Sequence, residues 1–286
     1  MIDPAGGTLL RLAAFTADPA GGNPAGVWIG DTLPPVDQMQ RIAAEVGFSE
    51  TAFLAPDGSG EPGRFRVRYF SPLAEVAFCG HATIASGVIL AERGAPDDLL
   101  LRTNDGEVGL SLQHGPDGRR VATLTSVEPH VVPAPAALLE RALALLDWDP
   151  SELDPRLPPA IAYAGVRHLI IAVRDYATLG RMAYPFEPMQ ALMLEHDLTT
   201  LQLIWREGPL RFRARDPFAV GGVVEDPATG AAAAALGAYL RERGEIVAPA
   251  TFEISQGVEM GRPSQLRVSI VSDDTRIRVS GTAVPM

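Results

Sequence analysis

The feature of this sequence that most constrains its fold is an internal repeat of about half the chain length. In each half, an amphipathic run beginning with Met-Gln is followed by an apolar stretch, by arginines that alternate with other residues, and by a run of small apolar residues. The paired landmarks are Met39 and Met189, residues 64–70 and 211–215, Thr83 and Thr229, and Gly94 and Gly244. Two copies of one pattern predict two similar lobes that arose by duplication.

The spacing of the landmarks changes slightly along the repeat. Thr83 and Thr229 are 146 positions apart, whereas Gly94 and Gly244 are 150 positions apart. If each Ala-Thr pair marks the same point of a helix, the second helix should be longer than the first by about one turn of 3.6 residues.

The join between the lobes is expected where prolines interrupt regular structure. Pro129, Pro133 and Pro135 stand just before a run of helix-forming residues. We therefore expect an N-terminal lobe of residues 1–130 and a C-terminal lobe of residues 131–286.

Each half contains one helical pattern without a polar face. Residues 82–91 and 229–240 include no charged side chain, so neither helix can present a face to water. Both runs are too short to span a bilayer, and the segments around them alternate with a period of two, as strands with one buried face do. We predict an α+β fold in which each lobe is a curled, mostly antiparallel sheet wrapped around a central apolar helix.

Composition narrows the chemistry and the partners. All 24 basic residues are Arg, and the absence of Lys excludes Schiff-base catalysis and a P-loop lysine. The net charge of −11 argues against nucleic acid and anionic membrane as partners. The only cysteine, Cys79, cannot form an internal disulfide, and we recognise no signal peptide or spanning segment. These features indicate a cytoplasmic protein.

The starts of the two apolar helices carry small residues beside a polar one. Residues 79–83 read Cys-Gly-His-Ala-Thr, and residues 226–230 read Asp-Pro-Ala-Thr-Gly. Backbone N–H groups at the positive end of a helix can hold a carboxylate. The simpler alternatives are that Asp226 is a helix N-cap and His81 a turn residue. Matching positions in both copies favour a small acidic substrate held between the two helix starts.

One carboxylate occurs in only one copy of the repeat. Glu50 lies between a helix end at Gly47 and a strand, and the residue 150 positions later is Thr200. Residues that the shared fold needs should occur in both copies, whereas a catalytic residue need occur in only one. A half-buried carboxylate at the head of a strand is suited to accept and return a proton, so Glu50 is the candidate acid/base; an exposed surface glutamate is the alternative.

The sequence predicts no metal site. His114, His130, His168 and His196 lack metal-ligand spacing, and the carboxylates do not cluster as a hard cation requires. We interpret Cys79 as a small buried residue, because no second thiol accompanies it.

Five short motifs, taken together and in order, resemble the PhzF family. They are Gly-Gly-Asn-Pro at 21–24, Ser-Glu-Thr-Ala-Phe at 49–53, Phe-Cys-Gly-His-Ala-Thr at 78–83, Glu-Asp-Pro-Ala-Thr-Gly at 225–230, and Gln-Gly-Val-Glu-Met-Gly-Arg-Pro-Ser at 256–264. The resemblance extends from about residue 15 to the C-terminus. It implies a diaminopimelate-epimerase-like fold with two duplicated lobes, an active site between them, and usually a homodimer.

The resemblance also implies a cofactor-independent isomerase. The family's namesake isomerises trans-2,3-dihydro-3-hydroxyanthranilate in phenazine biosynthesis, and its acid/base glutamate lies in the motif that contains Glu50 here. By the same matching, His81 and Asp226 would hold a small carboxylated substrate and assist proton movement. The backbone amides of Gly80 and Gly230 would hold its carboxylate or another oxygen.

Two positions depart from the family pattern. Ala231 stands where the family commonly has Ser, and Cys79 stands where it often has Ala. Loss of a hydrogen bond to a polar substrate group changes selectivity strongly, which argues against a substrate identical to the phenazine precursor. Epimerases of this fold carry a catalytic thiol near Cys79. We therefore keep two alternatives open: a racemase or epimerase that uses Glu50 or Cys79 with another base, and a catalytically silent small-molecule-binding scaffold.

Overall fold

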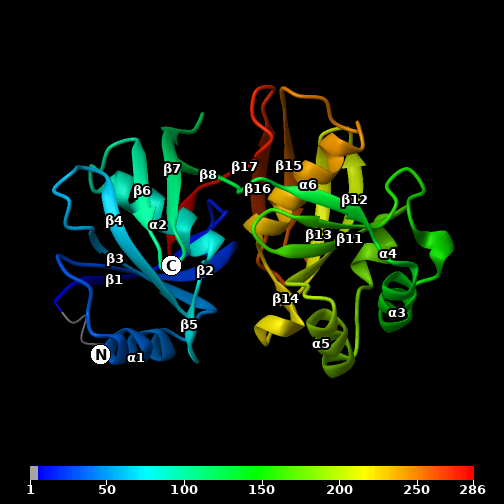
Figure 1. Ribbon diagram of the computed structural model, residues 1–286, viewed down its shortest axis with the longest axis horizontal. Coiled ribbons are helices and arrows are strands. Elements are labelled where there is room, and N and C mark those ends of the chain that lie inside the picture. The colour runs from blue at the N-terminus through cyan, green and yellow to red at the C-terminus, as the bar shows by residue number, and fades with distance from the viewer. Residues whose placement is uncertain (1–5) are drawn as a thin grey trace. The chain divides into compact units, whose positions relative to one another are not determined.

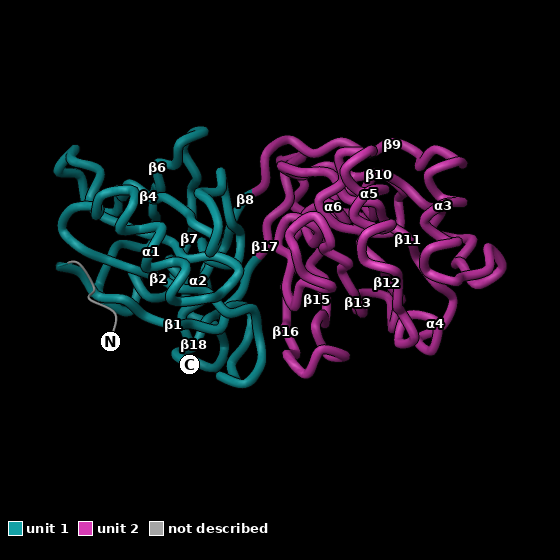
Figure 2. The backbone as a smooth tube through the Cα atoms, turned by 90° about the horizontal axis from the view of Figure 1, so that it is seen from below, with its two compact units in different colours: residues 1–125, 280–286 teal, residues 126–279 magenta. Residues whose placement is uncertain are grey.

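The computed structural model describes residues 6–286, which form two compact units. Unit 1 runs up to Thr125 and also includes Ser280–Met286, and unit 2 is Ser126–Val279 (Figure 2). The last strand of the chain therefore belongs with the first unit, a return that the repeat does not indicate. Each unit contains strands and helices (Figure 1), in agreement with the predicted α+β class.

The sheet of unit 1 is mostly antiparallel. Its neighbours are β18–β1–β2–β3–β4–β6–β7–β8, with short β5 also on β4, and only β2–β3 and β4–β6 are parallel. The strands are β1 (Thr8–Ala14), β2 (Asn23–Ile29), β3 (Glu50–Pro56), β4 (Arg64–Phe70), β5 (Glu75–Val76), β6 (Asp98–Arg102), β7 (Glu107–His114), β8 (Arg120–Thr125) and β18 (Ala283–Pro285).

Helix α2 (Gly80–Glu92) is the central helix of unit 1, as predicted. Every residue from His81 to Ala91 is buried, because α2 contacts β1, β2, β3, β7, β8 and β18 on its different sides (Figure 1). Helix α1 (Val36–Val46) is amphipathic and covers the other face of the sheet with Met39 and Ile42, which pack in the cluster around Trp28.

Unit 2 repeats the strand connections of unit 1. Here β11–β12 and β13–β15 are the parallel pairs, at the places that β2–β3 and β4–β6 take in unit 1, and β9–β10, β10–β11, β12–β13, β13–β14 and β15–β16 are antiparallel. The strands are β9 (His130–Pro133), β10 (Ala160–Tyr163), β11 (Arg167–Val173), β12 (Thr200–Gly208), β13 (Arg211–Pro217), β14 (Glu225–Asp226), β15 (Ala250–Gln256) and β16 (Ser264–Ile270); β17 (Arg278–Gly281) crosses the division between the units.

The helices of unit 2 follow the same plan. The apolar α6 (Gly230–Glu242) packs against β9, β10, β11 and β16, and α5 (Phe186–Glu195) takes the chain position of α1. The remaining helices are α3 (Ala136–Leu146), α4 (Tyr176–Gly180) and the short η1 (Pro150–Glu152) and η2 (Ala219–Gly221). Among the residues that the structure describes, no helix is long and apolar enough to cross a membrane.

The prediction of a longer second helix is wrong. Both α2 and α6 have 13 residues, and Gly80 and Gly230 begin them at an offset of 150 positions. Thr229 is the N-cap of α6 and therefore corresponds to Cys79, the N-cap of α2, and not to Thr83. The two Ala-Thr pairs, at residues 82–83 and 228–229, therefore lie one helical turn apart when α2 and α6 are aligned at their first residues.

Candidate active site

A left-handed turn places Glu50 at the head of β3. Helix α1 ends at Gly47, which has φ 72° and donates its N–H to the carbonyl of Ala43 at 3.1 Å. This conformation costs glycine little, and it takes the chain directly into β3. Strand β3 pairs in parallel with β2, with Glu50 opposite Ala25. Backbone hydrogen bonding between the strands therefore fixes the position of the Glu50 Cα, from which the carboxylate side chain extends.

The N-terminus of α2 places Cys79 and His81. Cys79 is extended, with φ −144° and ψ 113°, and its carbonyl accepts hydrogen bonds from the Thr83 N–H at 3.0 Å and the Thr83 hydroxyl at 2.7 Å. A Cβ added to Gly80 would meet only Phe78 Cε1, at 3.9 Å. Hydrogen bonds within α2 thus fix its first turn, and the space beside the Gly80 backbone is open.

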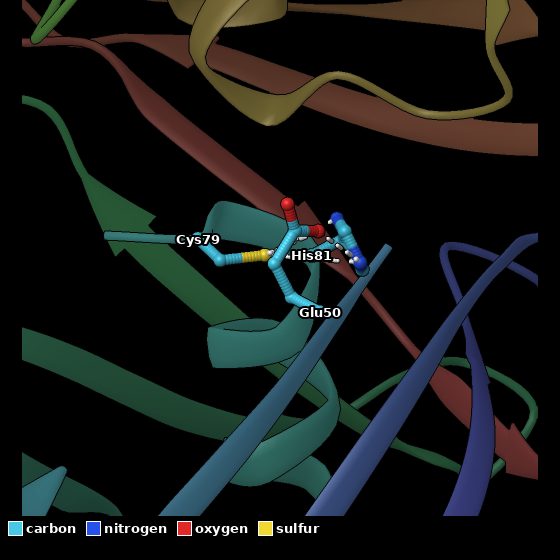
Figure 3. Close-up of side chains that lie close together, drawn as sticks. All are labelled: Glu50, Cys79 and His81. Carbon is cyan, nitrogen blue, oxygen red and sulfur yellow. Dashed lines mark hydrogen bonds and ion pairs between the residues drawn. The ribbon is translucent and has the colours of Figure 1, made fainter. Parts of the chain in front are cut away.

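Glu50, Cys79 and His81 converge although Glu50 is far from the other two in sequence (Figure 3). The thiol of Cys79 lies 3.4 Å from Glu50 Oε2 and 3.7 Å from His81 Nε2, and Glu50 Oε2 lies 3.5 Å from His81 Nε2. Ser49 Oγ is 3.5 Å from the same imidazole nitrogen. Cys79 and His81 are 6% exposed, and the Glu50 side chain is 16% exposed, so this group opens to solvent mainly at the carboxylate.

A second polar group surrounds the start of α6 in unit 2. The Thr229 hydroxyl donates to Asp226 Oδ2 at 2.6 Å. The side-chain amide of Gln256 donates to the Asp226 carbonyl at 2.8 Å and to Thr229 Oγ1 at 3.0 Å, and its Oε1 accepts the Thr229 N–H at 3.1 Å. Gln256 therefore supplies hydrogen-bond partners to the backbone of the loop before α6. The Thr229 hydroxyl accepts from Gln256 and donates its proton to Asp226, which holds the Asp226 carboxyl in one orientation.

Residue 257, which follows Gln256, has to be a glycine. It has φ 73°, and a Cβ there would meet the carbonyl oxygens of Arg262 at 2.5 Å and Pro227 at 2.8 Å. The backbone segments are too close here to leave room for a side chain. The end of β15 at Gln256 therefore packs directly against the loop that follows Asp226.

Asp216 is a buried acid beside this second group, and the sequence analysis did not single it out. It lies in β13 opposite Asp226 in β14 and is 0% exposed. Neither carboxyl oxygen has a hydrogen-bond partner among the described residues. Burial raises the pKa of Asp216 well above its usual value; the Thr229 hydroxyl opposes the shift, and the charges of Asp226 and Glu225 add to it. Burial therefore favours the neutral form of Asp216 over its carboxylate.

A buried ion pair fixes the β13–β14 corner. Arg215 donates from Nη2 and Nε to the two carboxylate oxygens of Glu225, at 2.6 and 3.0 Å, and from Nη1 to the carbonyl of Gly180 at 3.0 Å. Unit 1 has the equivalent pair of Arg68 and Glu75 between β4 and β5. By this alignment the repeat places Tyr69 where unit 2 has Asp216, so a residue-by-residue comparison of the copies contains the signal for Asp216.

The structure brings the predicted site residues into two groups. Glu50, Gly80 and His81 lie together in unit 1, and Asp226 and Gly230 lie at the start of α6 in unit 2. Their predicted roles stay predictions.

Thr200, the counterpart of Glu50 in the repeat, is entirely buried. The Thr200 hydroxyl lies 2.8 Å from Nδ1 of the buried His168. Thr200 in β12 is also the backbone partner of His168 in β11, just as Glu50 in β3 is the partner of Ala25 in β2. Burial lowers the pKa of His168 to about 3, so the imidazole is neutral. In unit 2 this position is structural; only unit 1 places a partly exposed carboxylate there.

Comparison with known proteins gives a consistent result. The family model "Phenazine biosynthesis-like protein" (PhzC-PhzF) matches residues 12–286. The trans-2,3-dihydro-3-hydroxyanthranilate isomerase of Pseudomonas fluorescens is 32% identical, over 96% of this chain and 95% of that protein. A PhzF-family phenazine biosynthesis protein of Bacillus anthracis superposes with a TM-score of 0.86 at 26% identity, covering 97% of this chain and 96% of its own.

The fold extends beyond close relatives. A hydroxyproline epimerase from Agrobacterium vitis superposes with a TM-score of 0.63 at 16% identity, over 98% of this chain and 90% of that one, which shows a shared fold. The fold and the comparisons therefore define an isomerase with an epimerase-like architecture of two duplicated lobes. Within this class the chain belongs to the PhzC-PhzF family, and the resemblance drawn from the five motifs is confirmed.

Proposed function

We propose that Glu50 removes a proton from one carbon of a small cyclic carboxylated substrate and returns it to another carbon of the same molecule. The C–H electron pair enters the conjugated system of the substrate, and a new C–H bond forms where the double bonds have shifted. Nothing is oxidised or reduced, so the reaction requires no cofactor.

The observation that carries this proposal is the placement of Glu50. It is the partly exposed carboxylate of a group with His81, at a position that the second copy of the repeat fills with the buried Thr200. A carboxylate within about 3 Å of a substrate carbon can serve first as base and then as acid. The nearby imidazole offers a hydrogen bond to the carboxylate or to a substrate oxygen.

We assign substrate binding to the helix starts. Gly80 and Gly230 begin α2 and α6, where backbone N–H groups at the positive end of a helix favour an anion. His81 and Asp226 are proposed to orient the substrate. Ala231 takes the place in α6 that His81 takes in α2 and supplies no hydroxyl, which supports a substrate that differs from the one named for the Pseudomonas relative.

Solvent deuterium tests the proposal. The protein is incubated in D₂O with trans-2,3-dihydro-3-hydroxyanthranilate and with a panel of related cyclic amino and hydroxy acids, and products are analysed by mass spectrometry and NMR. We expect isomerised product with one deuterium at the receiving carbon for at least one compound. Deuterium enters when the Glu50 carboxyl exchanges its proton with the solvent before returning it, and product without deuterium would mean return of the same proton. No reaction across the panel would contradict the proposed proton transfer or its substrate class.

A second candidate is a racemase in which Cys79 or Glu50 acts with another base on the opposite face of a carbon; the two groups are 3.4 Å apart, so they would lie on the same face of the substrate. Exchange of the α-proton of cyclic amino acids, abolished in Cys79→Ala, would support it. Undiminished turnover by that variant would contradict it.

We also propose, from the family resemblance, a homodimer in the cytoplasm with a place in phenazine-type biosynthesis. Sedimentation velocity should give twice the chain mass, and a sedimenting species of one chain mass would contradict the dimer.

A further inference from the structure

We propose that Glu50, Cys79 and His81 form a Zn²⁺ site, and that zinc bound there reversibly blocks the isomerase. The inference goes beyond the proposed function, because the metal would be an inhibitor and not a participant in proton transfer. It begins with the ligand types: thiolate, imidazole and carboxylate are the three side-chain groups that zinc binds in proteins. One atom from each side chain lies within 4.8 Å of the other two.

The distances within the group fit a tetrahedral zinc ion. Zn–S bonds of about 2.3 Å and Zn–N and Zn–O bonds of about 2.0 to 2.1 Å place sulfur about 3.6 Å from nitrogen or oxygen, and nitrogen about 3.4 Å from oxygen. The corresponding separations are 3.7 Å for Sγ–Nε2, 3.4 Å for Sγ–Oε2 and 3.5 Å for Oε2–Nε2. The thiol also lies 3.4 Å from His81 Nδ1, so the sulfur sits beside the imidazole ring and not in front of Nε2. Binding therefore requires the His81 ring to turn until Nε2 faces the metal, while the backbone stays in place.

The backbone supporting the group is ordered by hydrogen bonds. Cys79 is fixed at the start of α2 by the two bonds from Thr83, and Glu50 lies in the β2–β3 pairing. Zinc coordination by Nε2 would replace the 3.5 Å contact of His81 with Ser49. Because the backbone is already ordered, zinc binding costs conformational entropy mainly in the three side chains.

Three protein ligands leave one tetrahedral position for water or for a carboxylate of the substrate. Binding converts the Cys79 thiol to a thiolate and releases its proton, so that one Zn²⁺ replaces one H⁺ at sulfur. The Glu50 oxygen that coordinates the metal cannot at the same time accept a proton from carbon. Zinc therefore occupies the group that the proposed reaction uses, and a chelator should restore activity.

Cobalt is the probe for the site, because tetrahedral Co²⁺ replaces zinc and absorbs in the visible, while a cobalt–thiolate bond adds a near-ultraviolet band. The chain contains one cysteine, so a thiolate band in the purified protein can arise only from Cys79. We expect one Co²⁺ per chain with both signals, displaced by one equivalent of Zn²⁺. A titration without the thiolate band would overturn the proposal.

Matched variants separate this site from adventitious binding. In Cys79→Ser and His81→Asn the thiolate band or the tetrahedral spectrum should be lost, and zinc affinity should fall by more than about 10-fold, the lower end of the effect of outer-shell substitutions. His196→Asn is the control, since Nε2 of the partly exposed His196 lies 3.6 Å from Glu195 Oε1 and Cys79, the one thiol of the chain, is not part of that pair; the spectrum of this variant should match the wild type. Unchanged zinc affinity in the first two variants would overturn the proposal.

A measurement on the unaltered protein guards against misfolded variants. Zn²⁺ should slow alkylation of Cys79 by iodoacetamide by at least about 10-fold, because the coordinated sulfur is not free to react, and EDTA should restore the rate. Equal rates with and without zinc would contradict the site. These binding measurements do not depend on turnover. The proposal of a zinc site and the proposal of a catalytic role for Glu50 can therefore be contradicted independently.

Discussion

Replacement of Asp216 by Asn is expected to gain stability relative to the wild type as the pH rises above about 4. The side chain is completely buried, its two oxygens have no hydrogen-bond partner among the described residues, and it pairs with Asp226 across β13–β14. Burial raises the pKa of Asp216 well above its usual value of 3.8. The folded protein therefore retains a proton on Asp216 at a pH where the unfolded chain has lost it.

The sign and the size of the effect follow from that one proton. A group whose pKa is raised by folding contributes its full stability below its unfolded pKa, and this stability is lost as the pH rises towards the folded pKa. One extra proton bound by the folded state changes the free energy of unfolding by about 1.4 kcal/mol per pH unit. The amide of Asp216→Asn does not titrate, so the stability of the variant relative to the wild type should increase with about this slope from roughly pH 4 up to the folded pKa of Asp216.

Urea unfolding at a series of pH values measures this difference directly. The free energy of unfolding is compared for wild type, Asp216→Asn and Asp273→Asn at about pH 4, 5, 6 and 7. Asp273 is exposed, so its variant should follow the wild type at every pH. A constant difference between Asp216→Asn and wild type, or one that falls as the pH rises, would refute the assignment of a buried neutral acid.

Two further predictions concern the scaffold of the second group. Gly244→Ala, with φ 71° and no atom within 4 Å of its Cβ, should cost about 1 to 2 kcal/mol from backbone strain. Gly257→Ala should cost about 1 to 3 kcal/mol more, because its Cβ would also meet two carbonyl oxygens; urea denaturation compares them. Arg215→Ala should cost about 3 to 5 kcal/mol by leaving Glu225 buried without its partner, and exposed Arg141→Ala less than about 1 kcal/mol; equal losses in either pair would contradict the packing described.

The repeat made the fold predictable, because apolar helices without a polar face require a sheet around them. It also singled out Glu50 as the candidate acid/base, since a comparison of the copies separates a partly exposed carboxylate from the structural Thr200. The same comparison failed locally where two Ala-Thr pairs looked equivalent: Thr83 and Thr229 lie one turn apart in their helices. Identical residues within two regular helices do not show how the helices should be aligned. The glycines that begin α2 and α6 do show it.

Convergence in space was the part that the sequence could not supply. Cys79 and His81 flank one glycine, but Glu50 joins them only because β3 starts beside the first turn of α2. The absence of metal-ligand spacing among the other histidines therefore said nothing about His81. Asp216 was missed for a different reason: the alternating pattern was read as ending at residue 215, while the strand continues to Pro217.

The central claim is that Glu50 carries the proton, and the turnover rate of Glu50→Gln tests it most directly. The substitution keeps the shape of the side chain and removes its basicity, and Glu45→Gln on the exposed side of α1 is the matched control. With the substrate identified by deuterium incorporation, we predict that kcat of Glu50→Gln falls by at least about 100-fold while ligand-induced thermal stabilisation persists and Glu45→Gln retains wild-type turnover. A Glu50→Gln variant that turns over as fast as the wild type would contradict the account.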